Sequence, residues 1–412
     1  MKKTSKFVFT KGLQVSILFL LSLPLYAQWT QTGLDGYYVR TITVSGSNVF
    51  VGTSGDGMFR STNNGLSWSP ANSGLVGLEF PAFAISGSNL YVGSEGEGVF
   101  LSINNGVSWS ALAPLTNQYV FALAVSGTDL YAGVDGGGVF RSTNNGASWT
   151  NSTSGMTNTR VSSLVISGSN LFAGTFGGAG VYLSTNNGTT WSAVNNGLSN
   201  TDVQTVNINP SLPGYIFVGT ANGAFYTTNN GASWNAINNG LTDTHVHTFA
   251  FSGTTIFAGT DMEGVFRSTN LGASWIAMNQ GLTNSIVWVL NASGSNLFAG
   301  TNGSGVFKRP LSEMVAVEQI SADIAGQYML SQNYPNPFNP VTTIKFGIVR
   351  SGNVQLRIYD VTGKMVSELL NSNINPGSYE IKWDASRYSS GIYFYSVVTN
   401  DFAQTKKMIL VK

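Results

Sequence analysis

Hydrophobic positions in this chain come in short runs of β-branched and aromatic residues, separated by Ser-Gly and Asn-Gly pairs. The first clear unit contains the runs VRTITV at 39–44, VFVGT at 49–53 and MFRS at 58–61, followed by a segment around Trp68. A turn, a glycine-rich loop and a tight turn separate these runs. Such spacing is typical of strands and hairpins. No stretch after residue 27 keeps a 3.6-residue period, so we predict an all-β fold with four short strands per unit.

The strongest signal is an internal repeat, the motif Ser-x-Asn-x-Gly-x-Ser/Thr-Trp. It occurs six times with spacings of 41, 40, 42, 43 and 41 residues, and Thr227 replaces the leading serine in the fifth copy. Repeats of about 40–45 residues with several short strands each are typical of propeller blades. The six copies end at Trp68, Trp109, Trp149, Trp191, Trp234 and Trp275.

The number of units predicts the number of blades. Seven first-strand segments are present, but the seventh unit stops at 309–310 without a Trp motif. Trp29 lies 39 residues before Trp68, as a fourth strand without a unit of its own. Without a fourth strand the last blade would leave an unpaired strand edge, and the N-terminal strand can cover it. We therefore predict a seven-bladed β-propeller over 28–310, with residues 29–33 completing the blade of 286–308. A six-bladed ring with irregular ends is the alternative.

The first 27 residues have the features of a secretory signal peptide. Four lysines precede an apolar run at 13–25, and Ala27 supplies a small residue at the cleavage position. The run is too short to span a bilayer comfortably, although an uncleaved anchor is the alternative. No later stretch is long enough, so we expect a mature protein that does not span the membrane.

Composition excludes several classes of function. The four lysines of the first segment account for the formal charge of +1, and the rest has 16 basic against 19 acidic residues. A nucleic-acid partner would need a basic face, which is absent, so none is expected. The chain has no cysteine, which excludes disulfides, thiolate zinc sites and cysteine nucleophiles.

The Trp motif resembles the Asp-box of sialidases and related propeller proteins, a hairpin between the third and fourth strands of a blade. In this sequence asparagine occupies the aspartate position of the box in every copy. Asparagine can bond its own turn, glycine supplies positive φ, and tryptophan packs between sheets. In the families it resembles the box is structural, so we expect the same of Asn63, Asn104, Asn144, Asn186, Asn229, Asn270 and the six tryptophans.

A ligand site is expected on the face opposite the box turns. Two positions at the start of each innermost strand vary between otherwise similar units, and several hold aromatic residues beside polar ones. Such groups suit sugar or peptide edges, although ordinary variation at loop–strand junctions would look the same. The candidate ligand residues are Tyr38, Arg40, Tyr119, Phe121, Arg160, Gln204, His245, His247 and Trp288.

No metal or cofactor is expected. His245 and His247 are the only histidines, and although they share one face of a strand, no third ligand is spaced to join them. Acidic residues in the glycine-rich loops, among them Glu95, Asp135 and Asp261, offer at most two carboxylates per loop. Calcium requires more oxygens, so solvated loop charge is the preferred interpretation.

The main alternative to a non-catalytic binding or structural module is a glycoside hydrolase of the sialidase-like or xyloglucanase-like kind. Its acid and base would be Glu79 and Asp202, the only carboxylates at the strand-start positions. They lie three units apart in a seven-unit ring, which predicts a separation above the about 5–10 Å of glycosidase pairs. The arginine triad of sialidases is not identifiable. An assembly factor like the photosystem II propeller is a weaker alternative, because that role needs no surface export.

The glycine repeat ends after Pro310, and we predict a linker at 311–327 and a separate domain at 328–412. Alternating apolar and polar residues at 354–358 and 379–383 predict antiparallel strands and a small C-terminal β-sandwich. The domain contains an ordered series of motif residues: Pro335, Asn336, Pro337, Phe338, Asn339, Pro340, Tyr359, Asp360, Gly363, Trp383, Asp384, Gly391 and Tyr393. This series closely resembles the type A sorting domain of the type IX secretion system.

This resemblance implies export across the outer membrane of a Gram-negative bacterium. The partner of the C-terminal domain would be the type IX secretion machinery, and the protein would be secreted or attached to the outer-membrane surface. The domain gives the destination but not the ligand, for which a glycan or a surface protein is expected.

Overall fold

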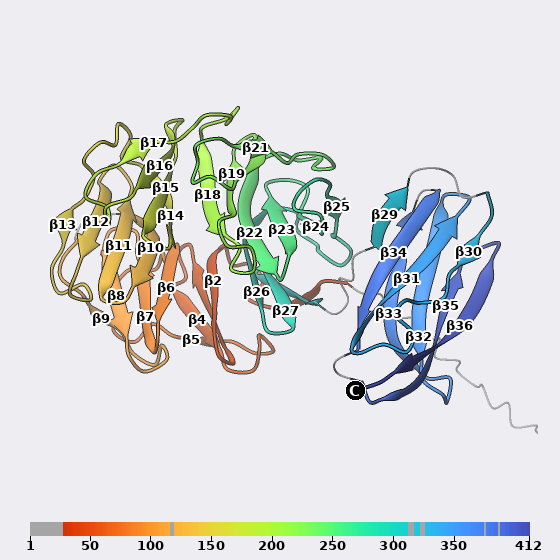
Figure 1. Ribbon diagram of the computed structural model, residues 1–412. Coiled ribbons are helices and arrows are strands. Elements are labelled where there is room, and N and C mark those ends of the chain that lie inside the picture. The colour runs from red at the N-terminus through yellow and green to blue at the C-terminus, as the bar shows by residue number, and fades with distance from the viewer. Residues whose placement is uncertain (1–27, 116–118, 312–316, 322–325, 375, 386–387) are drawn as a thin grey trace, which may run out of the picture.

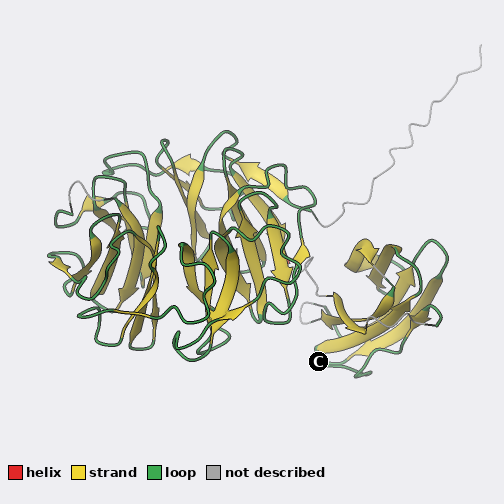
Figure 2. Cartoon of the chain, turned by 90° about the horizontal axis from the view of Figure 1, so that it is seen from above, coloured by secondary structure: helices red, strands yellow, loops and turns green. Residues whose placement is uncertain are grey.

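The computed structural model describes residues 28–115, 119–311, 317–321, 326–374, 376–385 and 388–412 (Figure 1). The predicted signal peptide, residues 1–27, lies outside them. Figure 2 shows strands and loops throughout the described part, without an α-helix, and accordingly no described helix is long and apolar enough to cross a membrane. The predicted fold class, a seven-bladed β-propeller followed by a small β-sandwich, is confirmed.

The first six blades are consecutive four-stranded antiparallel sheets. The first three comprise β2 (Val39–Ser45), β3 (Asn48–Thr53), β4 (Met58–Ser61) and β5 (Ser69–Pro70); β6 (Ala82–Ser86), β7 (Asn89–Gly93), β8 (Val99–Ser102) and β9 (Ser110–Ala111); and β10 (Val120–Ser126), β11 (Asp129–Val134), β12 (Gly138–Ser142) and β13 (Thr150–Asn151). The next three comprise β14 (Val161–Ser167), β15 (Asn170–Thr175), β16 (Gly180–Ser184) and β17 (Ser192–Ala193); β18 (Val203–Ile208), β19 (Ile216–Thr220), β20 (Gly223–Thr227) and β21 (Asn235–Ala236); and β22 (Val246–Ser252), β23 (Thr255–Thr260), β24 (Val265–Ser268) and β25 (Ile276–Ala277).

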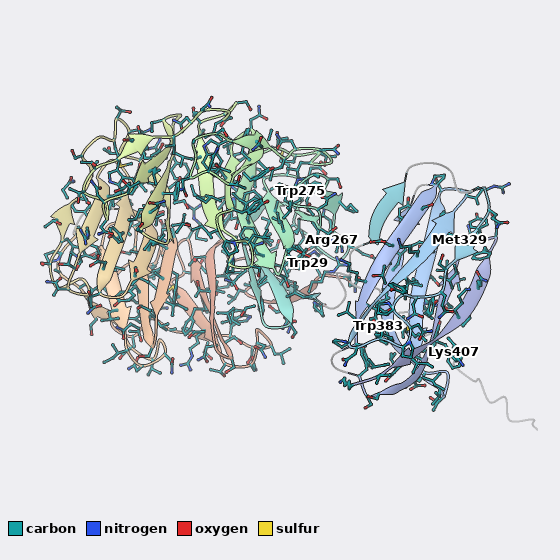
Figure 3. All side chains as sticks on the ribbon, viewed as in Figure 1. Trp29, Arg267, Trp275, Met329, Trp383 and Lys407 are labelled. Atoms are coloured by element: carbon teal, nitrogen blue, oxygen red, sulfur yellow. The ribbon has the colours of Figure 1, made fainter. Side chains whose placement is uncertain are left out.

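The seventh blade combines both ends of the propeller chain. It contains β26 (Val287–Ser293), β27 (Asn296–Thr301), β28 (Val306–Pro310) and, as its outermost strand, β1 (Thr30–Gly33). In the β1–β28 ladder Thr30 is opposite Lys308. Trp29 is only 2% exposed, and its indole Nε1 donates a 2.6 Å hydrogen bond to the Met278 carbonyl of the preceding blade. Figure 3 labels Trp29 and Trp275 in this part of the ring.

The same tryptophan contact joins other blades. The indole nitrogens of four box tryptophans donate to a carbonyl of the blade before, at 2.6–2.9 Å, and all four rings are buried. These are Trp109, Trp191, Trp234 and Trp275. Trp29 therefore takes the place that the Trp motif holds elsewhere.

Each box turn is held by its own side chains. In the first copy Asn63 Oδ1 accepts hydrogen bonds from Ser61 Oγ and the Ser67 amide, both at 2.9 Å, while the Gly65 amide donates to Ser61 Oγ at 2.8 Å. Asn64 and Gly65 have φ of 55° and 78°, which asparagine and glycine tolerate. The pattern recurs in all six copies, with Thr227 Oγ1 replacing the serine oxygen in the fifth.

Glycine also sets the distance between blades. A Cβ at Gly52 in β3 would clash with the carbonyl oxygen of Phe80 in the next blade. The second strand of one blade therefore approaches the start of the innermost strand of the next blade closely only because glycine stands there, which accounts for part of the glycine content.

The C-terminal domain is a sandwich of two four-stranded sheets, with strand orders β29-β34-β31-β30 and β33-β32-β35-β36. Phe338, Ile344, Leu356 and Tyr395 belong to its buried core. Residues 317–321, within the predicted linker, form β29 against β34. The strands are β29 (Val317–Ser321), β30 (Met329–Leu330), β31 (Val341–Ile348), β32 (Gly352–Tyr359), β33 (Met365–Ile374), β34 (Gly377–Asp384), β35 (Gly391–Val398) and β36 (Ala403–Leu410).

Candidate functional site

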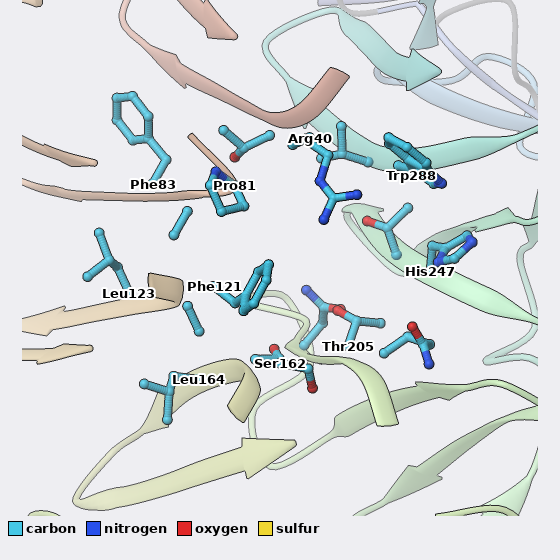
Figure 4. A pocket seen from close by; sticks show the side chains of 18 of the residues that line it. Arg40, Pro81, Phe83, Phe121, Leu123, Ser162, Leu164, Thr205, His247 and Trp288 are labelled. Carbon is cyan, nitrogen blue, oxygen red and sulfur yellow. The ribbon is translucent and has the colours of Figure 1, made fainter. Parts of the chain in front are cut away.

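A cavity of about 530 Å³ lies at the centre of the propeller, lined by the innermost strands of all seven blades. Figure 4 shows Arg40, Phe121, His247 and Trp288 around it. Of the nine predicted ligand residues, these four and Gln204 line the cavity.

One backbone pattern positions the side chains at the mouth of this cavity. A fully buried residue near the start of each innermost strand, such as Val39 or Val246, is flanked by two residues that we call the first and second rim positions. A third rim position follows the second strand, and its amide donates to the carbonyl of the first rim residue at 2.9–3.2 Å in every blade. In blade order, the first rim residues are Tyr38, Glu79, Tyr119, Arg160, Asp202, His245 and Ile286. The second rim residues are Arg40, Pro81, Phe121, Ser162, Gln204, His247 and Trp288. The third rim residues are Ser54, Glu95, Asp135, Phe176, Ala221, Asp261 and Asn302.

Blades one and seven form an aromatic and cationic part of the mouth. The Arg40 guanidinium lies 4.7 Å from the centre of the Trp288 ring. Tyr38, which is 47% exposed, lies beside the same indole with 6.2 Å between the ring centroids. The three predicted residues therefore form one amphipathic surface, with the charge of Arg40 over an aromatic face.

Blades three and four form a second aromatic part. Phe121 contacts Phe176 edge to face, with 6.1 Å between ring centroids. Arg160 Nε donates to Asp135 Oδ1 at 2.7 Å, and its guanidinium carbon lies 6.0 Å from the Phe176 ring. The hydrogen bond and the charge of Asp135 raise the pKa of Arg160, which stays a cation. Tyr119 is 49% exposed, and its backbone forms an isolated antiparallel β-bridge with Glu95.

Glu79 is paired with a different carboxyl from the one predicted. Its neighbour is Glu95, the third rim residue of the same blade, whose amide donates to the Glu79 carbonyl at 3.1 Å and whose carboxyl is influenced by that of Glu79. Burial, followed by the interaction with the Glu79 carboxyl, raises the pKa of Glu95 to about 7. Asp202 Oδ1 instead accepts the Gly177 amide at 2.9 Å. No described contact joins Glu79 to Asp202. Glu95 was expected as a solvated loop charge, and its place beside Glu79 follows from the pairing of the first two strands of the blade.

The expectation that no third group would join the two histidines is wrong. Asp261, the third rim residue of the sixth blade, lies beside both rings. His247 Nε2 is 2.9 Å from Asp261 Oδ1, and His245 Nδ1 is 3.9 Å from Asp261 Oδ2. Burial lowers the pKa of His247, and the hydrogen bond to Asp261 opposes this shift. This cluster could hold a metal ion.

The motifs of the C-terminal domain meet around its last strand, β36. The Phe338 amide donates to the Ile409 carbonyl at 3.0 Å, and Asn336 Oδ1 accepts from the Ile409 amide at 2.9 Å. Phe338 is 2% exposed and packs against Trp383, with 5.6 Å between ring centroids. The proline-rich segment therefore holds the final strand on the sandwich.

Other motif residues have turn or core positions. Tyr393 stacks edge to face with Trp383 at 5.5 Å, and Tyr359 is opposite Phe394 in the sheet. Asp360 Oδ1 accepts hydrogen bonds from Thr362 and from the Lys364 amide, which lowers its pKa and closes the β32–β33 turn where Gly363 has a φ of 79°. The side chain of Asp384 is outside the described part.

Residues 332–412 match the family model described as a secretion system C-terminal sorting domain. The C-terminal domain is a sorting domain of the type IX system. The sorting domain indicates secretion or attachment at the outer-membrane surface, and it implies an interaction with the secretion machinery. No curated protein matches the chain.

The propeller resembles solved structures at low sequence identity. The GH74 enzyme of Niastella koreensis is 19% identical with a TM-score of 0.52, over 67% of this chain and 43% of that enzyme. YCF48 from Cyanidioschyzon merolae is 16% identical with a TM-score of 0.54, over 69% and 98% of the two chains. The GH74 xyloglucanase of Xanthomonas campestris is 14% identical with a TM-score of 0.56, over 78% and 59%. These likenesses show the propeller fold, and the chain spans less than half of the first enzyme.

Proposed function

We propose that this protein is an exported propeller that binds a glycan at the mouth of its central cavity without cleaving it. The observation that carries the proposal is the surface formed by Tyr38, Arg40 and Trp288, which borders the cavity. Aromatic faces pack against the apolar face of a sugar ring, and a small number of polar groups fix its orientation.

The other rim residues support the same function. Phe121 lies on another blade of the same cavity, where Gln204 offers both amide donors and a carbonyl acceptor. A chain of several sugar residues could therefore contact two aromatic parts of the mouth at once. A surface protein with exposed carboxylates is the second candidate, because Arg40 offers the cation that would pair with them.

The carboxyl pair favours binding over hydrolysis. A Glu95 carboxyl with a pKa of about 7 resembles the general acid of a glycosidase. However, the carboxyl that acts most strongly on it is that of Glu79, a neighbouring rim residue of the same blade, whereas the two carboxyls of glycosidases flank the scissile bond at about 5–10 Å from each other. Two neighbours on one blade do not flank a bound sugar from opposite sides, so the arrangement favours binding.

The experiment is retention of the purified protein on a panel of glycans, with the mass of each glycan measured afterwards. We expect retention of at least one glycan class with unchanged mass. Shortened glycan that is abolished by Glu79→Gln or Glu95→Gln would overturn the proposal in favour of a hydrolase. Retention of peptides alone would replace the glycan by a protein partner.

A further inference from the structure

The sixth blade brings two imidazoles and a carboxylate together at the rim. His245 immediately precedes β22 and His247 is its second residue, so both side chains lie on one side of the strand, with 4.5 Å between ring centroids. Asp261 directly follows β23, and the hydrogen bond from its amide to the His245 carbonyl, at 3.2 Å, fixes it opposite the first histidine. The backbone of the blade therefore places the three groups.

The distances suit a common metal ion. The candidate ligand atoms of the three residues all lie within 4.8 Å of one another. Ligands at about 2.0–2.1 Å from a tetrahedral zinc ion stand about 3.3 Å from each other. His247 Nε2 lies 2.9 Å from Asp261 Oδ1, and His245 Nδ1 lies 3.9 Å from the other carboxylate oxygen, Oδ2, so the two separations fall on either side of that value.

The surroundings are prepared for such an ion. Asp243 Oδ1 accepts the His245 amide at 2.9 Å and its Oδ2 accepts the Met262 amide at 2.7 Å, which ties together the two segments that carry the ligands. Burial disfavours protonation of His247, and neutral imidazole is the form that binds metals. The ring nitrogen of His245 that faces Asp261 is Nδ1, so this is the atom available to an ion held by all three residues.

The donor set restricts the metal. Calcium and magnesium prefer oxygen ligands, whereas two imidazoles with one carboxylate suit zinc and its neighbours in the first transition row. Three protein ligands leave at least one coordination position for water or another ligand. His247 also lines the central cavity, so an ion on this cluster would border the space where a ligand enters.

We propose that His245, His247 and Asp261 bind one divalent transition-metal ion, zinc being the expected occupant, at the rim of the propeller. This site goes beyond glycan binding and stands on its own geometry. It is the only group of this kind among the described residues, because the other six blades place different side chains at the same three positions.

The test is titration of the full-length chain, treated with a chelator and then dialysed, with zinc chloride in a calorimeter. The two rim histidines are the only ones in the sequence, so the protein must be purified without a polyhistidine tag. We expect one zinc per chain, and a loss of affinity above about 100-fold in His247→Ala and in Asp261→Asn, since even outer-shell changes cost 10–100-fold. Asp135→Asn changes the same rim position of the third blade and is expected to bind zinc like the unmodified protein.

A second readout does not depend on the variants folding. Cobalt(II) added to the unmodified protein should give the intense visible absorption of an ion with few ligands, and zinc should displace it. No stoichiometric binding, a cobalt spectrum equal to that of the aqueous ion, or equal zinc affinity in folded Asp261→Asn would each overturn the proposal.

Discussion

Leu271 has a left-handed backbone conformation, with a φ of 60°, in the sixth box turn. The other five copies place asparagine at this position, with φ between 55° and 57°. Left-handed geometry costs most L-residues about 1–2 kcal/mol, and asparagine adopts it more readily. We therefore expect Leu271→Asn to raise the free energy of unfolding by about 1 kcal/mol in urea denaturation.

Leu66→Asn is the control for this change, because Leu66 lies in the equivalent turn of the first blade, is 71% exposed and has no positive φ. Its effect should stay within about 0.5 kcal/mol. An unchanged or lower stability of Leu271→Asn would contradict the explanation by backbone strain.

The Glu79–Glu95 pair predicts a pH-dependent stability. The folded state raises the pKa of Glu95 from 4.5 to about 7, so the folded protein binds its proton more tightly than the unfolded chain does. This contribution is fully present below pH 4.5 and is lost as the pH rises through about 7. Glu95→Gln keeps a neutral side chain, so its stability relative to the unmodified protein should increase between pH 5 and pH 8.

Thermal unfolding at several pH values measures this difference, with Glu97→Gln in the same loop as the control. Glu97 is exposed, and its replacement should leave the pH profile parallel to that of the unmodified protein. A parallel profile for Glu95→Gln as well would mean that the carboxyl pair does not share a proton.

At the scale of the elements, closure of the ring depends on β1. Trp29 buries its indole between the last two sheets and donates to Met278. Trp29→Ala should lower the free energy of unfolding by about 3–5 kcal/mol, as for other buried large residues. Gln31→Ala, on the exposed side of the same strand, should cost much less. Equal effects of the two changes in denaturant titrations would mean that β1 is not a structural part of the seventh blade.

The last strand of the sorting domain has a corresponding role. Because Asn336 and Phe338 both bond to Ile409 in β36, removal of residues 403–412 should expose the core of the sandwich and abolish recognition. We expect the truncated protein to accumulate in the periplasm of a host with a type IX system, seen by fractionation and immunoblotting. Normal secretion of the truncated protein would contradict this role of the domain.

The elements were largely predictable from the sequence, and the pairs at the rim were not. Asn-Gly turns and the Trp motif determine local hairpins, so the repeat alone indicated seven units and a strand beginning at Trp29. Glu95 and Asp261 are 16 residues from their partners Glu79 and His245, and the antiparallel ladder brings each pair together. Both residues hold the third rim position, which varies between blades as the two positions at the start of the first strands do.

At the scale of the whole molecule, the sorting domain and the propeller that we propose to bind a ligand are separate parts of the chain. The sorting domain occupies the C-terminal sandwich, and its resemblance was specific enough to identify from the sequence. The cavity face could be placed by the positions that vary between blades, but its ligand could not, because fold alone does not determine a ligand.

The most direct measurement compares the dissociation constant of the best-retained glycan for the unmodified protein, Trp288→Ala and Leu66→Ala. Trp288 borders the cavity, whereas Leu66 is exposed in a box turn on the opposite face. We predict a loss of affinity of at least about tenfold, 1.4 kcal/mol, for Trp288→Ala only. Unchanged affinity of Trp288→Ala, or an equal loss in Leu66→Ala, would contradict binding at the mouth of the propeller.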